Sequence, residues 1–294
     1  MTDPSPNTQS LPAAAAGRFT FAGSAISVNR MGYGAMRLAG PNAFGPPKDP
    51  DEALAILREA LALGVDHIDT SDFYGPHVTN RLIREALYPY PEGLVLVTKI
   101  GASRNDKGDW LLDRSPDFLR RSVEDNLERL GLSQLPLVNL RMGGPEDDMQ
   151  EPMRAMRQMR DEGLIGHIGI STVTTGQLAE AREIAPIACV QNHYNLVHRT
   201  DDAMIEALAQ DGIAYVPYFP LGGFTPLQSA TLSEVAAELG QSAQAVALAW
   251  LLQRSPNILL IPGTARRSHL RDNIAAAALK LPEAQLSRLN AIAS

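Results

Sequence analysis

The stretch Leu94-Val95-Leu96-Val97-Thr98-Lys99 decides the fold class, because it is a short apolar run that ends in a charged residue. An unbroken apolar run of this length is typical of a strand covered on both faces, as in a parallel sheet with helical crossovers. With this stretch, the chain holds eight candidate strands, several of which are near-continuous apolar runs. The other seven are Met31–Gly34, Asp66–Asp69, Leu135–Leu140, His167–Ile170, Ile187–Gln191, Ile213–Pro217 and Ile258–Ile261.

Helical patterns separate these candidate strands. Pro50 and Pro116 each follow a capping residue and predict helix starts. About eight β–α units in roughly 260 residues is the size of a (β/α)8 TIM barrel. A doubly wound sheet is the competing architecture, but its Gly-x-Gly-x-x-Gly turn is lacking, since Gly32 and Gly34 lead into a Pro/Gly-rich loop. We therefore expect an α/β barrel with an N-terminal β-hairpin over residues 19–28 and an extra C-terminal helix.

The composition narrows the class of protein and its partners. The 294 residues carry 26 Lys+Arg against 33 Asp+Glu, a formal net charge of -7, which argues against a nucleic-acid partner. No apolar run approaches the roughly 20 residues that a membrane helix needs. The single cysteine, Cys189, fits a reducing, cytoplasmic location, and six scattered histidines predict no metal site. We expect a floppy tail over residues 1–17 and a single domain over residues 18–294.

Charged residues stand where predicted strands end. Asp69, Lys99 and Arg141 each follow or close a strand that is otherwise apolar. In a (β/α)8 barrel the carboxyl ends of all strands meet at one mouth, where the chemistry takes place. A buried charge is costly to desolvate unless it is paired, so one carboxylate and two cations at a common mouth can serve one another. For any one of them alone, a solvated strand end or a structural ion pair is the alternative interpretation.

Three motifs together resemble the aldo-keto reductase superfamily. They are Gly64-x-x-x-x-Asp69-Thr70-Ser71-x-x-Tyr74-Gly75, the strand-terminal Lys99, and Ile261-Pro262-Gly263-Thr264 with Asn273. The resemblance covers nearly the whole chain after the tail. It implies a barrel that reduces carbonyls by hydride transfer from a nicotinamide. Further stretches resemble superfamily members that reduce pyridoxal to pyridoxine, at residues 34–36, 45–47, 72–80, 138–141 and 219–227.

The resemblance implies a catalytic role for three of these residues. Tyr74 matches the tyrosine that donates a proton to the carbonyl oxygen, and Lys99 matches the lysine beside it. Asp69 matches the carboxylate that keeps this lysine charged and oriented. A free phenol has a pKa of about 10, and a neighbouring ammonium favours the phenolate. We therefore expect Lys99 to bring the pKa of Tyr74 toward the operating pH.

Arg141 stands where most members of the superfamily have a histidine. Arginine stays charged and offers a planar fork of donors, so we do not expect a proton relay through this position. We expect Arg141 to stabilise negative charge on the carbonyl oxygen or on the substrate. One hypothesis is that Arg141 binds the ionised ring hydroxyl of pyridoxal while Tyr74 protonates the aldehyde oxygen. A structural pair with Asp69 or Asp72 is the alternative.

The resemblance also implies a cofactor site. Tyr218 matches the aromatic platform for the nicotinamide face, with Ser171 and Gln191 as partners of its carboxamide. Arg266 and Arg267 favour NADPH over NADH, because a guanidinium suits a 2′-phosphate, and either arginine can make that contact. The expected cofactor residues are Ser171, Gln191, Tyr218, Leu221, Gly222, Gly223, Gly263, Thr264, Arg266, Arg267 and Asn273.

Four aromatic residues in loops over the mouth, Phe44, Phe73, Trp110 and Phe224, are candidates for the substrate wall. An apolar wall excludes water and suits an aromatic aldehyde, although each ring can instead pack within its own loop. The predicted function is NADPH-dependent reduction of a small aldehyde by a monomer or weak homo-oligomer. Alternatives are a general aldehyde or ketone reductase, Schiff-base chemistry at Lys99, and a nicotinamide-binding sensor with weak turnover.

Overall fold

Seven parallel strands form one curved sheet in the computed structural model, which describes residues 11–292. The strand order β11-β10-β9-β8-β5-β4-β3 means that each strand lies beside its sequence neighbour in the sheet. Parallel neighbours of this kind need helical crossovers, which confirms the predicted α/β architecture. The strands are β3 (Tyr33–Gly34), β4 (His67–Asp69), β5 (Val95–Ile100), β8 (Leu135–Arg141), β9 (Ile165–Ser171), β10 (Ile187–Gln191) and β11 (Ala214–Tyr215).

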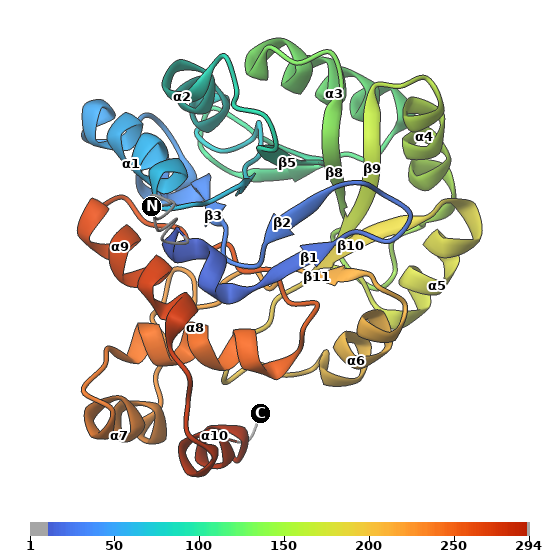
Figure 1. Ribbon diagram of the computed structural model, residues 1–294. Coiled ribbons are helices and arrows are strands. Elements are labelled where there is room, and N and C mark those ends of the chain that lie inside the picture. The colour runs from blue at the N-terminus through green and yellow to red at the C-terminus, as the bar shows by residue number, and fades with distance from the viewer. Residues whose placement is uncertain (1–10, 293–294) are drawn as a thin grey trace, which may run out of the picture.

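The eighth predicted strand, residues 258–261, closes the barrel without forming a regular strand. Ile258 forms a parallel bridge with Tyr215 of β11, and Leu260 forms one with Met31, just before β3. Each bridge is isolated, so the segment contributes too little pairing to be a strand of its own. The bridges nevertheless join both edges of the curved sheet, and the predicted (β/α)8 barrel is confirmed. Figure 1 views this barrel along its axis.

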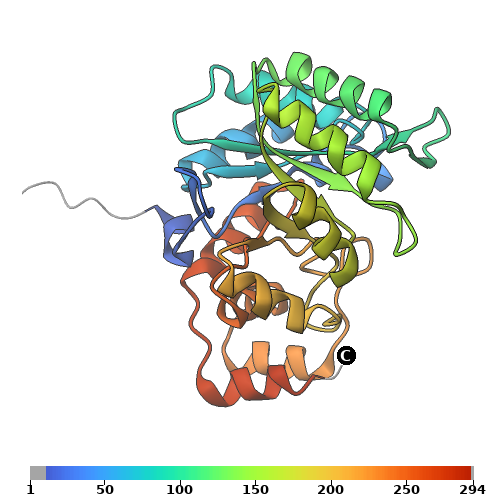
Figure 2. The same ribbon diagram turned by 90° about the vertical axis from the view of Figure 1, so that its right-hand side faces the viewer.

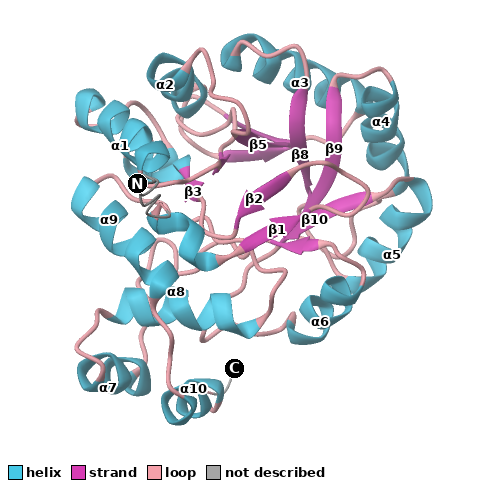
Figure 3. Ribbon diagram, viewed as in Figure 1, coloured by secondary structure: helices cyan, strands magenta, loops and turns pink. Residues whose placement is uncertain are grey.

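Helices cover the outside of the barrel, as Figure 3 shows. Asp49 caps the first of them as predicted, because its side chain accepts a hydrogen bond from the backbone N–H of Glu52 (3.0 Å). The extra C-terminal helix is also present, and Trp250 ties it to the barrel by donating from Nε1 to Asn290 Oδ1 (2.8 Å). The helices are α1 (Pro50–Ala62), α2 (Val78–Leu87), α3 (Pro116–Leu130), α4 (Gln150–Asp161), α5 (Thr175–Ile184), α6 (Asp202–Gln210), α7 (Ala230–Glu238), α8 (Ala243–Arg254), α9 (Arg267–Ala275) and α10 (Glu283–Asn290), with 3-10 turns η1 (Pro12–Ala16), η2 (Ala35–Leu38), η3 (Pro41–Ala43) and η4 (Ala276–Ala278).

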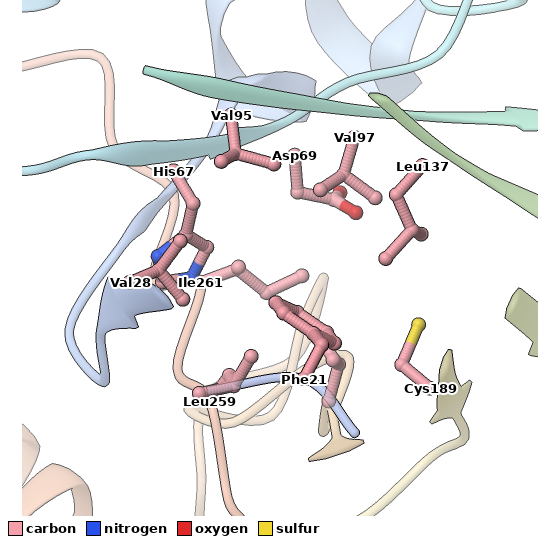
Figure 4. Close-up of a pocket in the computed structure, with 11 residues that line it drawn as sticks. Phe21, Val28, His67, Asp69, Val95, Val97, Leu137, Cys189, Leu259 and Ile261 are labelled. Carbon is pink, nitrogen blue, oxygen red and sulfur yellow. The ribbon is translucent and has the colours of Figure 1, made fainter. Parts of the chain in front are cut away.

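The predicted N-terminal hairpin closes one end of the barrel. Strands β1 (Arg18–Thr20) and β2 (Ser27–Asn29) pair antiparallel, and Phe21 in the connecting turn is buried among the inward residues of the barrel. Figure 4 shows its ring beside a small cavity of the barrel interior. A second hairpin, β6 (Ala102–Arg104) and β7 (Trp110–Leu112), was not expected from the sequence. It projects from the opposite end, as Figure 2 shows, and so stands beside the mouth.

Alternation along the strands explains why functional residues gather at the mouth. Successive side chains of a strand point to opposite faces, so residues two apart share a face. In β5, Val95 and Val97 lie in the barrel interior, whereas Leu96 packs toward the helices. The same alternation continues to Lys99, which therefore points inward at the carboxyl end of the strand. Asp69, two residues after His67 in β4, lies inward for the same reason.

The predicted floppy tail is too long. Residues 12–16 form the turn η1, in which Ala13 is fully buried and Ala16 is 8% exposed. The tail prediction is therefore wrong for this segment, because two small apolar side chains pack into the core, and residues 1–10 lie outside the described part of the chain. Between residues 11 and 292, no single helix is long and apolar enough to cross a membrane. Helices α7 and α8 meet that criterion only as a pair, which is bent by 96°.

Candidate active site

Asp69 and Lys99 form a buried ion pair at the mouth of the barrel. Lys99 Nζ lies 2.5 Å from Asp69 Oδ1 and also donates to the carbonyl oxygen of Thr70 (3.0 Å). Both charged side chains are 5% exposed. Gln191 Nε2 donates to the second carboxylate oxygen, Asp69 Oδ2 (2.9 Å). Because both of its oxygens accept hydrogen bonds, the carboxylate is held in one orientation.

Tyr74 lies against this pair. Lys99 Nζ is 5.1 Å from the centroid of the Tyr74 ring, and the tyrosine is 7% exposed. The rings of Phe73 and Tyr74 are nearly perpendicular, with a centroid separation of 5.3 Å. The backbone is fixed as well, since Tyr74 N donates to Ser71 O (3.1 Å) in the turn that follows β4. The structure therefore brings together the tyrosine, lysine and aspartate that the sequence singled out.

Burial decides the proton affinity of Tyr74. Removal from water raises the pKa of the Tyr74 phenol above its usual value, while the charges of Lys99 and Arg141 pull it down only in part. This direction is opposite to the one expected from the sequence, which considered the ammonium and not the desolvation. Burial also opposes the charge on Lys99, but Asp69 and Tyr74 outweigh it and raise the pKa of the lysine. At neutral pH the site therefore holds a phenol beside an ammonium.

Arg141 faces the same space without a carboxylate partner. It ends β8, is half-buried, and donates from Nη1 to Thr172 Oγ1 (3.2 Å). Within the described residues, no carboxylate lies at ion-pair distance from Arg141, because Asp69 pairs with Lys99 and Asp72 pairs with His77 and Arg129. The alternative of a structural ion pair thus finds no support. A guanidinium is available to an anionic group in the cleft.

A cleft of about 620 Å³ opens at this mouth. This volume is within the range of cofactor and ligand sites, and Asp69, Lys99 and Tyr74 form one part of the wall. Most of the residues singled out from the sequence line it: Asp69, Phe73, Tyr74, Lys99, Trp110, Arg141, Gln191, Tyr218, Leu221, Gly223, Phe224, Gly263, Thr264 and Arg266.

Five predicted residues do not line the cleft. Arg267 turns to α1, where its Nε pairs with Glu52 Oε2 (2.9 Å), so only its neighbour Arg266 faces the cleft. Phe44 packs beside Arg104, with 5.3 Å between its ring centroid and Arg104 Cζ. The other three are the buried Ser171, the buried Asn273 in α9, and Gly222, whose φ of 91° shapes the loop after β11.

Two buried polar atoms near the cleft have no hydrogen-bond partner within residues 11–292. They are Ser171 Oγ and Gln191 Oε1, on residues that are register partners at the ends of β9 and β10. A hydroxyl that can donate beside an amide oxygen that can accept fits a ligand carboxamide, which carries both groups. Tyr218 supplies a flat ring in the cleft wall and is itself stacked on His193, at 5.6 Å and 9°. These residues therefore fit a nicotinamide.

Eleven residues of the cleft wall were not among the site residues expected from the sequence, and Met36, Arg37, Gln244 and His269 are four of them. Arg37 donates to the carbonyl oxygen of Gly223 (2.5 Å), and its Cζ is 5.6 Å from the centroid of Phe224. It follows β3 directly, in η2, so the criterion of charged residues after strand ends would have found it.

Comparison with known proteins agrees with this geometry. Residues 30–294 match the Aldo/keto reductase family, which confirms the resemblance seen in the motifs. The chain is 61% identical over 279 residues to pyridoxine 4-dehydrogenase of Escherichia coli K12, covering 93% of this chain and 98% of that protein. It is 39% identical over 264 residues to an uncharacterized oxidoreductase of Schizosaccharomyces pombe, covering 90% and 86%.

The fold comparison gives the same family. A thermostable aldo-keto reductase, solved in complex with the inhibitor epalrestat, superposes with a TM-score of 0.80 at 29% sequence identity. The superposition covers 94% of this chain and 99% of that one. From the family match, the barrel and the Tyr74–Lys99–Asp69 group, we conclude that this chain belongs to the aldo/keto reductase family of oxidoreductases.

Proposed function

We propose that this chain is an NADPH-dependent reductase of small aldehydes that interconverts pyridoxal and pyridoxine. The observation that carries the proposal is the buried Asp69–Lys99 pair beside Tyr74 in the wall of the cleft. The substrate is supported by the 61% identity to the pyridoxine 4-dehydrogenase of Escherichia coli. A monomeric or weakly oligomeric enzyme and a cytoplasmic location, expected from the sequence, are part of the proposal.

Each residue of the site has a separate role in proton transfer. Reduced nicotinamide, when bound, supplies a hydride to the carbonyl carbon. Tyr74 holds the proton for the carbonyl oxygen, and burial keeps this phenol protonated at neutral pH. Lys99 and Arg141 place positive charge beside the phenolate that remains after the proton is given. Asp69 keeps Lys99 charged and fixes its position.

Arg141 accounts for the substrate specificity of the proposed enzyme. Pyridoxal has a ring hydroxyl beside its aldehyde, and this hydroxyl ionises readily. A guanidinium that lacks a carboxylate partner in the described chain is suited to hold that oxygen while Tyr74 faces the aldehyde. Histidine at this position offers a single donor and loses its charge near neutral pH.

The cofactor assignment rests on the cleft wall. Ser171 and Gln191 would hold the carboxamide with their unpartnered buried atoms, and Tyr218 would cover one face of the ring. Of the two candidate arginines, Arg266 would bind the 2′-phosphate, since Arg267 pairs with Glu52. The remaining expected contacts, apart from Asn273 in α9, lie in two segments that border the cleft, residues 221–223 and 263–264.

The alternative of a lysine Schiff base is disfavoured by the state of Lys99. Attack on a carbonyl requires a neutral amine. The charges of Asp69 and Tyr74 raise the pKa of Lys99, and its Nζ already donates to Asp69 and to the carbonyl of Thr70. A binding module without turnover is disfavoured because all three residues of the proton-donating group are present and in contact.

The test is a panel of aldehydes with the purified full chain. We expect consumption of NADPH, followed by its absorbance, with pyridoxal, and formation of NADPH from NADP and pyridoxine. Tyr74→Phe should abolish both. Turnover of other aldehydes but not of pyridoxal contradicts the substrate. Tight NADPH binding without reduction of any carbonyl contradicts the enzyme assignment in favour of a sensor, and an adduct trapped by borohydride contradicts it in favour of Schiff-base chemistry.

A further inference from the structure

The guanidinium of Arg104 joins two aromatic rings beside the cleft. Its Cζ lies 4.1 Å from the centroid of Trp110 and 5.3 Å from that of Phe44. A cation over an aromatic face at these distances is attracted by the quadrupole of the ring. Of the two rings, Trp110 lines the cleft and Phe44 does not. Arg104 thus connects a ring of the cleft wall to a ring packed outside it.

Backbone carbonyls hold this guanidinium in place. Arg104 Nε donates to Gly108 O (2.9 Å) within its own hairpin, and both Nη atoms donate to Asn42 O (3.3 Å each). Nη1 also donates to Ala43 O (3.4 Å). No carboxylate in the described part of the chain lies at ion-pair distance from it. The half-buried arginine is therefore a bridge between the hairpin β6–β7 and the loop after β3, not one member of a salt bridge.

The loop that Arg104 holds is strained. Asn42 and Ala43 have φ values of 55° and 56°, a region that side-chain-bearing residues rarely adopt. Hydrogen bonds from Arg104 to both of their carbonyl oxygens help to maintain this conformation. Phe44, the next residue, is thereby kept against the guanidinium.

A chain of ring contacts links Arg104 to the reacting group. Trp110 meets Phe73 nearly edge-on, with centroids 5.3 Å apart, and Phe73 meets Tyr74 at the same separation. Trp110 is 45% exposed, so it depends on a neighbour to fix its ring. Arg104 itself does not line the cleft. Arg104 therefore reaches the cleft wall through its contact with the ring of Trp110.

We propose that Arg104 is a positioning residue for substrate selection. By fixing the indole of Trp110 in the cleft wall, it favours planar aromatic aldehydes over small aliphatic ones. A flat ring gains from a preformed flat wall, whereas a short aliphatic chain does not need one. This inference rests on the proposed carbonyl reduction and concerns which carbonyls are preferred.

The first test is the ratio of kcat/KM for benzaldehyde to that for propanal, with NADPH. Arg104→Met should lower this ratio by about fivefold or more, the equivalent of one cation–π contact, and mainly through the KM of benzaldehyde. Arg104→Lys, which keeps the charge, should restore part of it. The matched control is Arg182→Met, an exposed arginine paired with Asp211 on the outside of the barrel, which should leave the ratio unchanged. In a Trp110→Ala background, Arg104→Met should have no further effect on the ratio.

The second test measures binding without turnover. The chain has two tryptophans, and Trp250 is fully buried, so the quenching of fluorescence by added pyridoxine reports mainly on Trp110. Pyridoxine should bind more weakly to Arg104→Met than to the parent or to Arg182→Met. A parent that reduces no aldehyde contradicts the proposed function, and this titration then still decides the role of Arg104. An unchanged ratio and unchanged binding in a folded Arg104→Met enzyme, or equal losses for both aldehydes, overturn the inference.

Discussion

Replacing Asp69 by Asn removes one charge of the buried pair and leaves the other. Lys99 Nζ would lose the carboxylate and keep its hydrogen bond to the carbonyl oxygen of Thr70, which is 3.0 Å away. The side chain of Lys99 is 5% exposed, so its charge would stay buried. Breaking a buried ion pair by removing one partner destabilises a protein by about 3–5 kcal/mol, because the remaining charge is desolvated without compensation. At roughly 2–4 °C per kcal/mol for a chain of this size, Tm should fall by about 6–20 °C.

Two further variants separate the charge from the shape of the side chain. Asp69→Asn combined with Lys99→Met removes both charges, so it should be more stable than Asp69→Asn alone. The matched control is Asp211→Asn, which breaks an exposed pair with Arg182 and should change the free energy of unfolding by less than about 1 kcal/mol. Urea unfolding followed by circular dichroism measures all of these free energies under one set of conditions.

The dependence on pH gives a second check with a defined sign. In the parent, Asp69 and Tyr74 raise the pKa of Lys99 against the effect of burial, so the pair stabilises the fold fully below the usual pKa of lysine, and this contribution is lost as the pH rises through the raised pKa. In Asp69→Asn the main opposing charge is gone and burial lowers the pKa of Lys99. The deficit relative to the parent should therefore be largest at neutral pH and shrink at alkaline pH. A deficit below about 1 kcal/mol at pH 7, or a double variant less stable than the single one, refutes the reasoning.

Three further predictions concern activity and cofactor binding. Tyr74→Phe should lower kcat at least about a hundredfold. In the parent, the rate of reduction should stay flat from about pH 6 to about pH 9, because burial raises the pKa of the Tyr74 phenol. A fall in the rate within that range contradicts Tyr74 as the proton donor. Arg141→His should reduce kcat/KM for pyridoxal about tenfold more than for an aldehyde without the ring hydroxyl, and equal losses contradict a contact with that oxygen. Arg266→Ala should raise the Kd of NADPH about tenfold while leaving that of NADH unchanged, whereas Arg267→Ala should alter neither, as calorimetric titration can show.

The fold could be predicted because its strands are short and apolar on both faces. Residues 95–97 lie between the barrel interior and the helices, so the sequence shows an unbroken apolar run over residues 94–97 where a half-exposed strand would alternate. The closing segment, residues 258–261, has the same composition but makes only isolated bridges. An apolar composition predicts that a segment is buried on both faces. It does not predict how many backbone hydrogen bonds the segment forms with its neighbours.

The hairpin β6–β7 could not be predicted for the opposite reason. Trp110 and its two neighbours in β7 are all exposed, so there is no buried face to impose a period of two on the sequence. Its conformation depends instead on contacts with residues distant in the sequence, among them the ring of Phe73 beside Trp110. The same limit applies to Phe44, which the sequence places in a loop near the mouth but cannot assign to the cleft or to its outer side.

The residues of the cleft also differ in whether the sequence alone could predict their position. Those at the carboxyl ends of strands, such as Lys99 and Gln191, could be found because strand position fixes the end of the barrel at which they lie. Arg266 and Arg267 are adjacent in sequence and alike in chemistry, so only the position of Glu52, 215 residues away from Arg267, separates their roles. Long-range partners of this kind leave no local signal.

The raised pKa of Tyr74 bears on the direction of the reaction. Reduction consumes a proton and oxidation of an alcohol releases one, so a residue that stays protonated at neutral pH is set to give its proton to a carbonyl. Taking a proton from pyridoxine requires the phenolate, which Lys99 and Arg141 stabilise but which burial makes scarce. The rate of alcohol oxidation should therefore rise with pH over the range in which the rate of aldehyde reduction is flat. Only a base other than Tyr74 would allow both rates to be independent of pH.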